Sequence, residues 1–502
     1  MNTYGFFASR FGKNSSKLFL ESDTGERYTY ADVERETARY ANILTGLGLQ
    51  RGDRVAAQVD KSPQAIFIYL ACLRAGLCYL PLNSAYQQSE IGYFLNDAQP
   101  GVAICSPASQ ELFARLCSEA SVPHLFTLDD RGLGSFTDES ANAGTQFATV
   151  ASQPDDLAVI IYTSGTTGRS KGAMVTHDNL ASNAQVLCEA WRITAQDVLI
   201  HALPIFHIHG LFVALNTILL SGATLLFHRK FDPNAIIRDL PLATMLMGVP
   251  TFYTRLLSEP TFTREACNNI RLFVSGSAPL LLDTFNEFIK RTGHTILERY
   301  GMSEAGMICS NPYDGERRGG TVGMPLPGVT LRIAGDGGKP APVSDPGVIE
   351  IKGANVFSGY WRMPDKTKEE FTDDGFFKTG DIGVIDHDGY VSIVGRAKDL
   401  IISGGFNVYP KEIELVIDAI EGVAESAVIG LPHPDFGEAV VAVIVRGHNG
   451  MMLDQAGVIA YVKNQLANYK VPKQIHFVDV LPRNTMGKVQ KNLLRDQFAI
   501  KK

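Results

Sequence analysis

The sequence has few of the features that mark nucleic-acid-binding, metal-binding and membrane-spanning proteins. Positive charge is not in excess, because 46 Lys and Arg face 53 Asp and Glu and the formal net charge is −7. This balance argues against a nucleic-acid-binding protein. The seven cysteines form no C-x-x-C pair and show no metal-ligand spacing. Most stand among apolar neighbours, so we expect buried cysteines in a reducing compartment.

Long apolar runs are also absent. The most apolar stretch, residues 210–227, is interrupted by Asn, Thr, Ser and Gly, so we interpret it as a buried helix that leads into a buried strand and expect no membrane span. The first twenty residues lack acidic side chains, as transit peptides do, but they contain no signal-peptide core with a cleavage site. We therefore expect a mature N-terminus and a cytoplasmic protein.

Helical and strand patterns alternate through the first 150 residues and again after residue 172. Apolar runs at 54–59, 101–105, 198–201 and 272–275 alternate with helical periodicities, an order typical of a largely parallel sheet. From residue 323, strands separated by Gly, Pro and Asp indicate a small β subdomain, and the pattern changes again near residue 395. We predict an α/β protein with a large N-terminal domain, residues 1–395, and a small α+β domain, residues 396–502.

The chain is organised around residues 162–172, Tyr-Thr-Ser-Gly-Thr-Thr-Gly-Arg-Ser-Lys-Gly. Glycines allow a backbone to turn its N–H groups into one concavity, hydroxyls add donors, and Lys171 adds a positive charge. These parts suit a polyphosphate, although the Walker A spacing is absent. The alternative is a Ser/Thr/Gly-rich surface loop.

Five further stretches carry groups suited to chemistry. Two histidines stand two apart among apolar residues at 204–210, where core histidines are the alternative. A turn of small residues at 275–279 follows a strand, and ligand crevices lie at such strand ends. Residues 299–304 bring together an aromatic ring, a hydroxyl and a carboxylate suited to Mg2+. Asp381 stands in a turn that could accept from a ribose, and Lys488 stands on a loop in a basic tail.

Together and in this order, these stretches resemble the acyl- and aryl-CoA synthetases of the adenylate-forming superfamily, which also includes firefly luciferases and adenylation domains of peptide synthetases. The resemblance covers nearly the whole chain. It implies a large N-terminal domain, a small mobile C-terminal lid and an active site between them. It also implies ATP, Mg2+ and coenzyme A as reactants and cofactor.

The resemblance implies a role for each matching residue. The phosphate loop would contain Thr163, Ser164, Gly165, Thr166, Thr167, Gly168 and Lys171. The remaining nucleotide contacts would come from Gly276, Ser277, Ala278, Tyr300, Gly301, Ser303, Asp381 and Arg396. Lys488, Glu304 and His207 would be catalytic, Glu304 and Thr163 would hold the metal, and Lys398 would be the hinge. Coenzyme A would contact Ser403, Gly404 and Gly405.

The implied reaction has two steps. A carboxylate attacks the α-phosphorus of ATP and gives an acyl-AMP and pyrophosphate. Because two anions must approach each other, Mg2+ and Lys488 would offset the developing charge. The lid would then rotate about Lys398, and coenzyme A would attack the activated carbonyl and release AMP.

Arg299 indicates which acid is the substrate. Relatives mostly carry a small or neutral residue before the Tyr-Gly-Met motif, and Arg299 with its flanking stretches resembles the malonyl-CoA synthetases. A guanidinium beside the acyl pocket would pair with a second carboxylate, with His207, Ser277 and Met302 as further substrate contacts. The alternative is that Arg299 pairs with Glu298 or faces solvent. The small residues Ala305-Gly306 that follow Glu304 would widen the pocket, so methylmalonate is an alternative substrate.

Other activities are less consistent with these residues. A ligase for a fatty or aryl monocarboxylate is the main alternative and would need an open apolar tunnel. An inactive nucleotide-binding homologue would not need all of the charged motif residues. A peptide-synthetase module would need a carrier domain after Lys488, and a peroxisomal luciferase would need a different C-terminal tripeptide. The expected partners are small molecules, with a lysine acetyltransferase acting on Lys488 as a further candidate.

Overall fold

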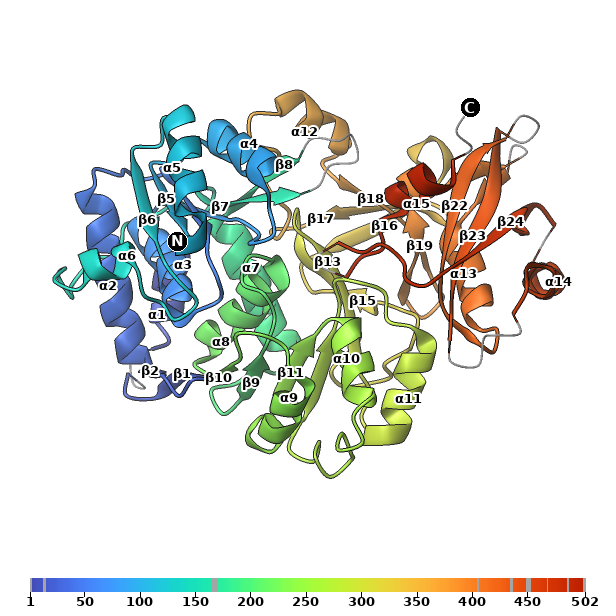
Figure 1. Ribbon diagram of the computed structural model, residues 1–502, viewed down its shortest axis with the longest axis horizontal. Helices are drawn as coiled ribbons and strands as arrows, with labels where there is room; N and C mark the ends of the chain where they lie inside the picture. The colour runs from blue at the N-terminus through green and yellow to red at the C-terminus, as the bar shows by residue number, and fades with distance from the viewer. Residues whose placement is uncertain are drawn as a thin grey trace. The chain divides into compact units, whose positions relative to one another are not determined.

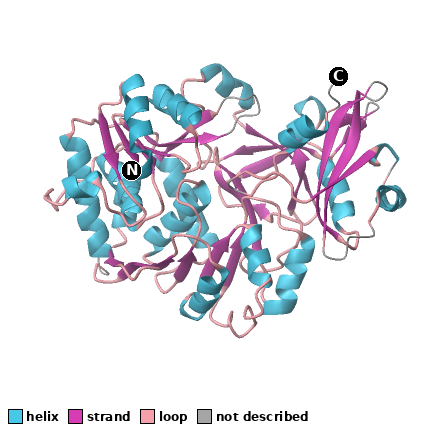
Figure 2. Ribbon diagram, viewed as in Figure 1, coloured by secondary structure: helices cyan, strands magenta, loops and turns pink. Residues whose placement is uncertain are grey.

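The computed structural model describes residues 2–11, 15–163, 170–403, 406–433, 437–447, 453–466, 468–484 and 487–499. The chain folds into two compact units. The N-terminal unit contains Met1–Thr330 and Lys352–Phe377, and the C-terminal unit contains Leu331–Ile351 and Lys378–Lys502. Figure 1 shows the chain coloured from one end to the other, and Figure 2 shows its helices and strands.

The first sheet of the N-terminal unit has, among the described residues, six strands in the order β6-β5-β3-β4-β7-β8. All neighbours in this sheet are parallel except β7 and β8, which form an antiparallel pair. The bounds are β3 Arg54–Gln58, β4 Cys78–Pro81, β5 Val102–Cys105, β6 His124–Thr127, β7 Leu157–Thr163 and β8 Lys171–Thr176.

The second sheet of this unit has nine described strands in the order β15-β14-β13-β12-β11-β9-β10-β1-β2. Its central strands, from β1 through β10, β9, β11 and β12 to β13, are parallel. The bounds are β1 Leu18–Ser22, β2 Arg27–Thr29, β9 Val198–His201, β10 Thr224–Phe227, β11 Met245–Gly248, β12 Leu272–Ser275, β13 Leu297–Met302, β14 Gly306–Ser310 and β15 Met324–Pro325.

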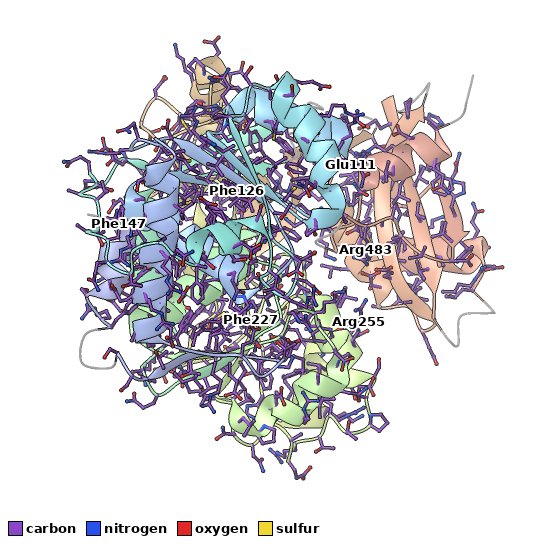
Figure 3. The ribbon with its side chains drawn as sticks, turned by 60° about the vertical axis from the view of Figure 1, so that its left-hand side comes forward. Glu111, Phe126, Phe147, Phe227, Arg255 and Arg483 are labelled. Atoms are coloured by element: carbon purple, nitrogen blue, oxygen red, sulfur yellow. The ribbon has the colours of Figure 1, made fainter. Side chains whose placement is uncertain are left out.

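Helices connect and cover these strands (Figure 1). Figure 3 labels Phe227 on β10, which is buried, and Glu111 and Arg255 on two of the helices, which are exposed. The helices of the N-terminal unit are α1 Thr3–Ala8, α2 Tyr30–Gly46, α3 Pro63–Ala75, α4 Gln88–Ala98, α5 Gln110–Glu119, α6 Ser135–Ser140, α7 His177–Ala190, α8 Asn216–Ser221, α9 Pro233–Asp239, α10 Pro250–Leu257, α11 Leu282–Thr292 and α12 Pro364–Glu370.

The C-terminal unit contains two described sheets, in the orders β16-β17-β18-β19 and β21-β20-β23-β22, with β24 paired to β23. The strands are β16 Thr330–Ala334, β17 Gly347–Lys352, β18 Phe377–Ile385, β19 Val391–Arg396, β20 Ile401–Ser403, β21 Phe406–Val408, β22 Val423–His433, β23 Gly437–Arg446 and β24 Gln474–Val478. Its helices are α13 Pro410–Asp418, α14 Gln455–Gln465 and α15 Lys491–Phe498.

Local sequence signals explain where these elements begin. The Ser62 side chain accepts from the backbone N–H of Ala65 at the start of α3, and Pro63 takes the first helical position, where its missing N–H costs nothing. The Thr176 hydroxyl and the Asn179 amide form a capping box at the start of α7. The predicted strands at 198–201 and 272–275 have the observed bounds.

The predicted fold class is confirmed: a large N-terminal part of mainly parallel α/β sheets is followed by a smaller C-terminal part. Residues 210–227 contain α8 and β10, as expected, with a π-helix, His209–Leu215, before them. In the described part of the chain, no helix has the length and apolar character to span a bilayer. All seven cysteines are free, and six are buried.

Candidate active site

Arg299 lies on β13 and is only 3% exposed. Among the described residues, neither its Nε nor its Nη2 has a hydrogen-bond partner. Burial lowers the pKa of Arg299 to about 9, although Tyr253 and Glu298 act in the opposite direction. The Glu298 carboxylate accepts from the backbone N–H of Leu280 at 3.1 Å. The structure therefore holds a buried guanidinium whose described surroundings leave two N–H groups unused, an arrangement that favours an anion.

The turn after β12 is shaped to admit this guanidinium. A Cβ on Gly276 would lie 2.5 Å from Cζ of Arg299, so no larger residue fits there without displacing the arginine. Ser277, the next residue, has a φ of 71°, an uncommon conformation for a residue with a side chain. The Ser275 hydroxyl is buried without a described partner. This strand end thus places a buried hydroxyl and a turn with a positive φ beside Arg299.

His209 brings an imidazole to the same place. Its Nδ1 lies 3.3 Å from Oγ of Ser277, and its buried Nε2 has no partner among the described residues. Burial and the Arg299 charge lower the pKa of His209 well below its usual value. A neutral imidazole can donate one N–H and accept at the other nitrogen, so His209 is suited to contact a polar ligand.

His207, the histidine that the sequence pointed to, is half-buried and lies in the loop before the π-helix. Its Nδ1 accepts from the backbone N–H of His209 at 3.3 Å. The two histidines are therefore linked, and the fully buried His209 lies beside Ser277. The His-Ile-His spacing was visible in the sequence, but the contact of His209 with Ser277 depends on the backbone path.

The carboxylate of Glu304 lies at a second cluster in the N-terminal unit. Its Oε1 accepts from Thr163 Oγ1 at 3.3 Å and from the Tyr360 hydroxyl at 3.2 Å, and the residue is 8% exposed. Burial and the Glu304 charge raise the pKa of Tyr360, so this phenol stays protonated and remains a donor. The two predicted metal ligands, Thr163 and Glu304, are thus brought together by the fold.

Lys171 opens β8, opposite Thr163 at the end of β7. Its Nζ lies 3.2 Å from Oε1 of Glu370 on α12 and 4.3 Å from the centroid of the Tyr360 ring. The predicted phosphate lysine is therefore held beside Glu304 by an ion pair and an aromatic face. Neither Tyr360 nor Glu370 was named from the sequence, because both lie about two hundred residues further along the chain.

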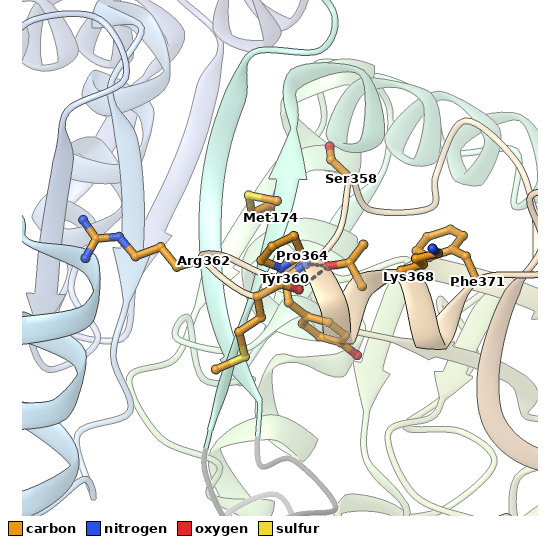
Figure 4. Close-up of a pocket in the computed structure, with 9 residues that line it drawn as sticks. Met174, Ser358, Tyr360, Arg362, Pro364, Lys368 and Phe371 are labelled. Carbon is orange, nitrogen blue, oxygen red and sulfur yellow. Dashed lines mark hydrogen bonds between the residues drawn. The ribbon is translucent and has the colours of Figure 1, made fainter.

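A cavity of about 580 Å³ is lined in part by Tyr360. Met174, Pro364 and Phe371 give it apolar walls, and Figure 4 shows Arg362 directed away from the other labelled side chains. The backbone N–H of Tyr360 donates to Thr367 Oγ1 at 2.8 Å. This contact holds the backbone of a residue that lines the cavity and whose hydroxyl donates to Glu304.

Asp381 and Arg396 form a pair within the C-terminal unit. They are cross-strand partners on β18 and β19, and Arg396 Nε lies 2.6 Å from Asp381 Oδ1. Asp381 is 2% exposed, whereas the Arg396 side chain is 39% exposed. The fold thus joins two residues that the resemblance had linked to one ribose.

Lys488 is exposed on a short hairpin that begins after β24. An isolated bridge joins Arg483 and Val489, and the backbone N–H of Lys488 donates to Oδ1 of Asn484 at 2.9 Å. Arg483 donates to the backbone oxygen of Gly487 and pairs with Glu425 on β22. The backbone at Lys488 is therefore held by contacts of the residues before it and after it.

The other predicted residues lie as follows. Tyr300, Gly301 and Met302 are half-buried on β13, and Ser303 and Ala278 are half-buried in the turns after β13 and β12. Ser403 ends β20 and is buried, and Lys398 lies in a 3-10 turn, Ala397–Asp399, directly after β19. Ser164, Gly165, Thr166, Thr167, Gly168, Gly404 and Gly405 lie outside the described residues.

The chain is similar to known proteins along most of its length. The profile described as AMP-binding enzyme matches residues 7–361, and the profile described as AMP-binding enzyme C-terminal domain matches residues 412–488. A feruloyl-CoA synthase of Amycolatopsis sp is 34% identical over 95% of this chain and 95% of its own. A malonate–CoA ligase of Arabidopsis thaliana is 34% identical over 96% and 82%. The ATP-bound crystal structure of MatB from Rhodopseudomonas palustris has a TM-score of 0.96 and 54% identity, covering 100% of this chain and 99% of that one.

Replacement of Gly276 by alanine tests how tightly Arg299 is packed. The added Cβ would overlap the guanidinium, so Gly276→Ala should destabilise the fold by about 1–3 kcal/mol and lower the melting temperature by about 2 °C or more. Gly46→Ala is the control, because nothing lies within 4 Å of its new Cβ. Equal melting temperatures for the two variants would show that Arg299 moves aside freely.

Proposed function

The chain belongs to the AMP-binding enzymes, and we propose that within this family it makes malonyl-CoA from malonate, ATP and coenzyme A. Its reaction class is that of an AMP-forming acid–CoA ligase, which uses ATP, Mg2+ and coenzyme A. The choice of malonate rests on one observation, the buried Arg299 whose Nε and Nη2 have no described partner. Methylmalonate, which adds one methyl group, stays within the same proposal.

The electrostatics favour an acid with a second carboxylate. Malonate carries two negative charges at neutral pH, and the one that does not react must be desolvated or nearly so. A buried carboxylate without a partner costs several kcal/mol, and a guanidinium offsets this cost with two parallel hydrogen bonds. Arg299, His209 and Ser275 all have buried donor atoms that lack partners among the described residues. A methyl end group, as in butyrate, would leave these donors unsatisfied.

The residues at Glu304 fit a magnesium ion that arrives with ATP. The described part of the chain contains no cluster of three or more His, Cys, Asp or Glu that could hold a metal, and Mg2+ at phosphates commonly takes only one or two carboxylates from the protein. We propose that Glu304 and Thr163 hold it. Bound Mg2+ supplies positive charge that offsets the phosphate oxygens.

The other residues take these roles in our proposal. Lys171 leaves its ion pair with Glu370 and contacts the phosphates. The adenine wall consists of Gly276, Ser277 and Ala278. Tyr300 stacks on the adenine ring, with Gly301 and Ser303 nearby. Asp381 and Arg396 bind the ribose, His207 and Met302 line the acyl site, and Ser403, Gly404 and Gly405 meet coenzyme A. Lys398, next to the proposed domain boundary at residue 395, is the hinge between the adenylation and thioester steps.

The proposal includes a cellular compartment and a modifying enzyme. The cysteines are free thiols, which supports a reducing compartment such as the cytoplasm. Lys488 is exposed, and we propose that a lysine acetyltransferase acts on it. Acetylation would remove the charge that the adenylation step needs.

Pyrophosphate release measured against a panel of mono- and dicarboxylic acids tests the proposal. The protein should use malonate in preference to butyrate, octanoate and ferulate, because only a dicarboxylate satisfies Arg299. A wild-type preference for any of the monocarboxylates would overturn the malonate assignment.

Arg299→Ala gives the sharper contrast. Removing one partner of a buried charge pair costs about 3–5 kcal/mol, so kcat/KM for malonate should fall on the order of a hundredfold or more while that for butyrate is unchanged or improved. Arg271→Ala is the control, because Arg271 is a half-buried arginine that pairs with Asp197 at 2.7 Å. Equal losses for both acids in Arg299→Ala would make Arg299 structural.

Lys488→Ala separates the two half-reactions. Pyrophosphate release should fall by about two orders of magnitude or more, because removing an aligned electrostatic group from a transition state has costs of this size. Thioester formation from supplied malonyl-AMP should change little. Lys491→Ala is the matched control, since Lys491 is a nearby lysine already paired with Glu414 at 2.6 Å. Equal losses in both half-reactions would contradict this division of labour.

A further inference from the structure

Lys61 has no ion-pair partner among the described residues and contacts an imidazole and backbone oxygens instead. Lys61 follows β3, and its Nζ donates to Nδ1 of His201 at 2.8 Å, to the backbone oxygen of His201 at 2.8 Å and to that of His228 at 2.7 Å. The same Nζ lies 4.4 Å from the centroid of the Phe227 ring, a residue labelled in Figure 3. An ammonium has three N–H groups, so all of them are used at the ends of β9 and β10.

These contacts determine which nitrogen of the His201 ring carries the proton. Nδ1 accepts from Lys61, so the ring proton must sit on Nε2, which donates to the backbone oxygen of Gly210 at 2.9 Å. Burial and the charge of Lys61 lower the pKa of His201 to about 3. The ring is therefore neutral throughout the physiological range and has one tautomer.

Gly210 connects this ring to the acyl site. A Cβ at Gly210 would lie 2.1 Å from the backbone oxygen of Pro204, so the segment from Pro204 folds tightly back on itself before the π-helix. His209, the residue before Gly210, has its Nδ1 3.3 Å from Ser277 Oγ. A hydrogen bond to the Gly210 carbonyl thus fixes the backbone that carries the His209 ring.

We propose that Lys61 and His201 are positioning residues for acid binding. They hold the Gly210 carbonyl, and through it His209, in place beside Ser277 and Arg299. Neither side chain contacts the site directly, so their effect is on where the acid is held and not on the nucleotide. The inference rests on the proposed function only in taking the surroundings of Arg299 and His209 as the acid site.

The competing account is a structural one. Lys61 comes from the sheet of β3, whereas its acceptors end β9 and β10 of the other sheet, so the contact also ties two sheets together. A tie between sheets would affect stability and every kinetic constant alike. A positioning role would affect the KM for the acid and leave the KM for ATP unchanged.

Lys61→Met tests the two accounts, because methionine has a similar length but neither charge nor donors. We expect the KM for the acid to rise about tenfold or more, the size expected for a lost hydrogen bond to a charged group, with the KM for ATP unchanged. Lys17→Met is the matched control. Lys17 donates to the backbone oxygens of Ala195 and Gly222, so its loss should lower the melting temperature without changing the KM for the acid.

Two variants of His201 keep the test decisive if Lys61→Met does not fold. His201→Gln retains an acceptor for Lys61 and a donor for Gly210, and its KM for the acid should stay close to the wild-type value. His201→Phe keeps a ring but loses both groups, and it should behave like Lys61→Met. A KM for the acid that is equal in the two variants, or that rises together with the KM for ATP, would overturn the inference.

The acid in these assays is whichever one the wild-type protein prefers in the panel above. If that acid is a monocarboxylate, the malonate assignment fails, but the comparison of the two KM values still tests Lys61 and His201. If it is malonate and the KM for malonate does not change in Lys61→Met, the positioning role fails and the assignment stands.

Discussion

A guanidinium buried without a described carboxylate partner is the constraint on which the acid side of this protein depends. Burying a charge is costly, and burial lowers the pKa of Arg299. The surrounding structure accommodates the side chain through the missing Cβ at Gly276 and a turn with a positive φ at Ser277. In the function that we propose, the unused donors bind a second carboxylate, so the cost of burying the guanidinium favours acids that carry one.

The groups around this cation are kept neutral. Burial together with a neighbouring positive charge lowers the pKa of both His209 and His201. Neutral imidazoles donate and accept at fixed nitrogens without adding charge that would compete with Arg299. Lys61 donates to an imidazole and to backbone oxygens, and no described carboxylate lies within hydrogen-bond reach of it. Burial lowers the pKa of Lys61 well below its usual value. Lys171, in contrast, is paired with the Glu370 carboxylate.

Each unit organises its own set of polar groups. In the N-terminal unit, two hydroxyls orient Glu304. In the C-terminal unit, a cross-strand ion pair joins Asp381 and Arg396, and a hairpin pinned by Arg483 presents Lys488. The contacts named here each lie within one unit. The proposed mechanism uses the two sets of groups in two chemical steps on one protein.

The sequence by itself determined the family, the parallel α/β sheets and the identity of the charged residues, because apolar periodicity and short motifs depend on neighbours in the chain. It also indicated Arg299, but not whether Glu298 or solvent would satisfy it. Only the tertiary structure decided that Arg299 is buried beside Gly276, that His209 lies against Ser277, and that Tyr360 and Glu370 join Glu304 and Lys171. These outcomes, like the contact of Lys61 with His201, depend on segments up to about two hundred residues apart, whose approach is set by sheet order and packing and leaves no local pattern to read.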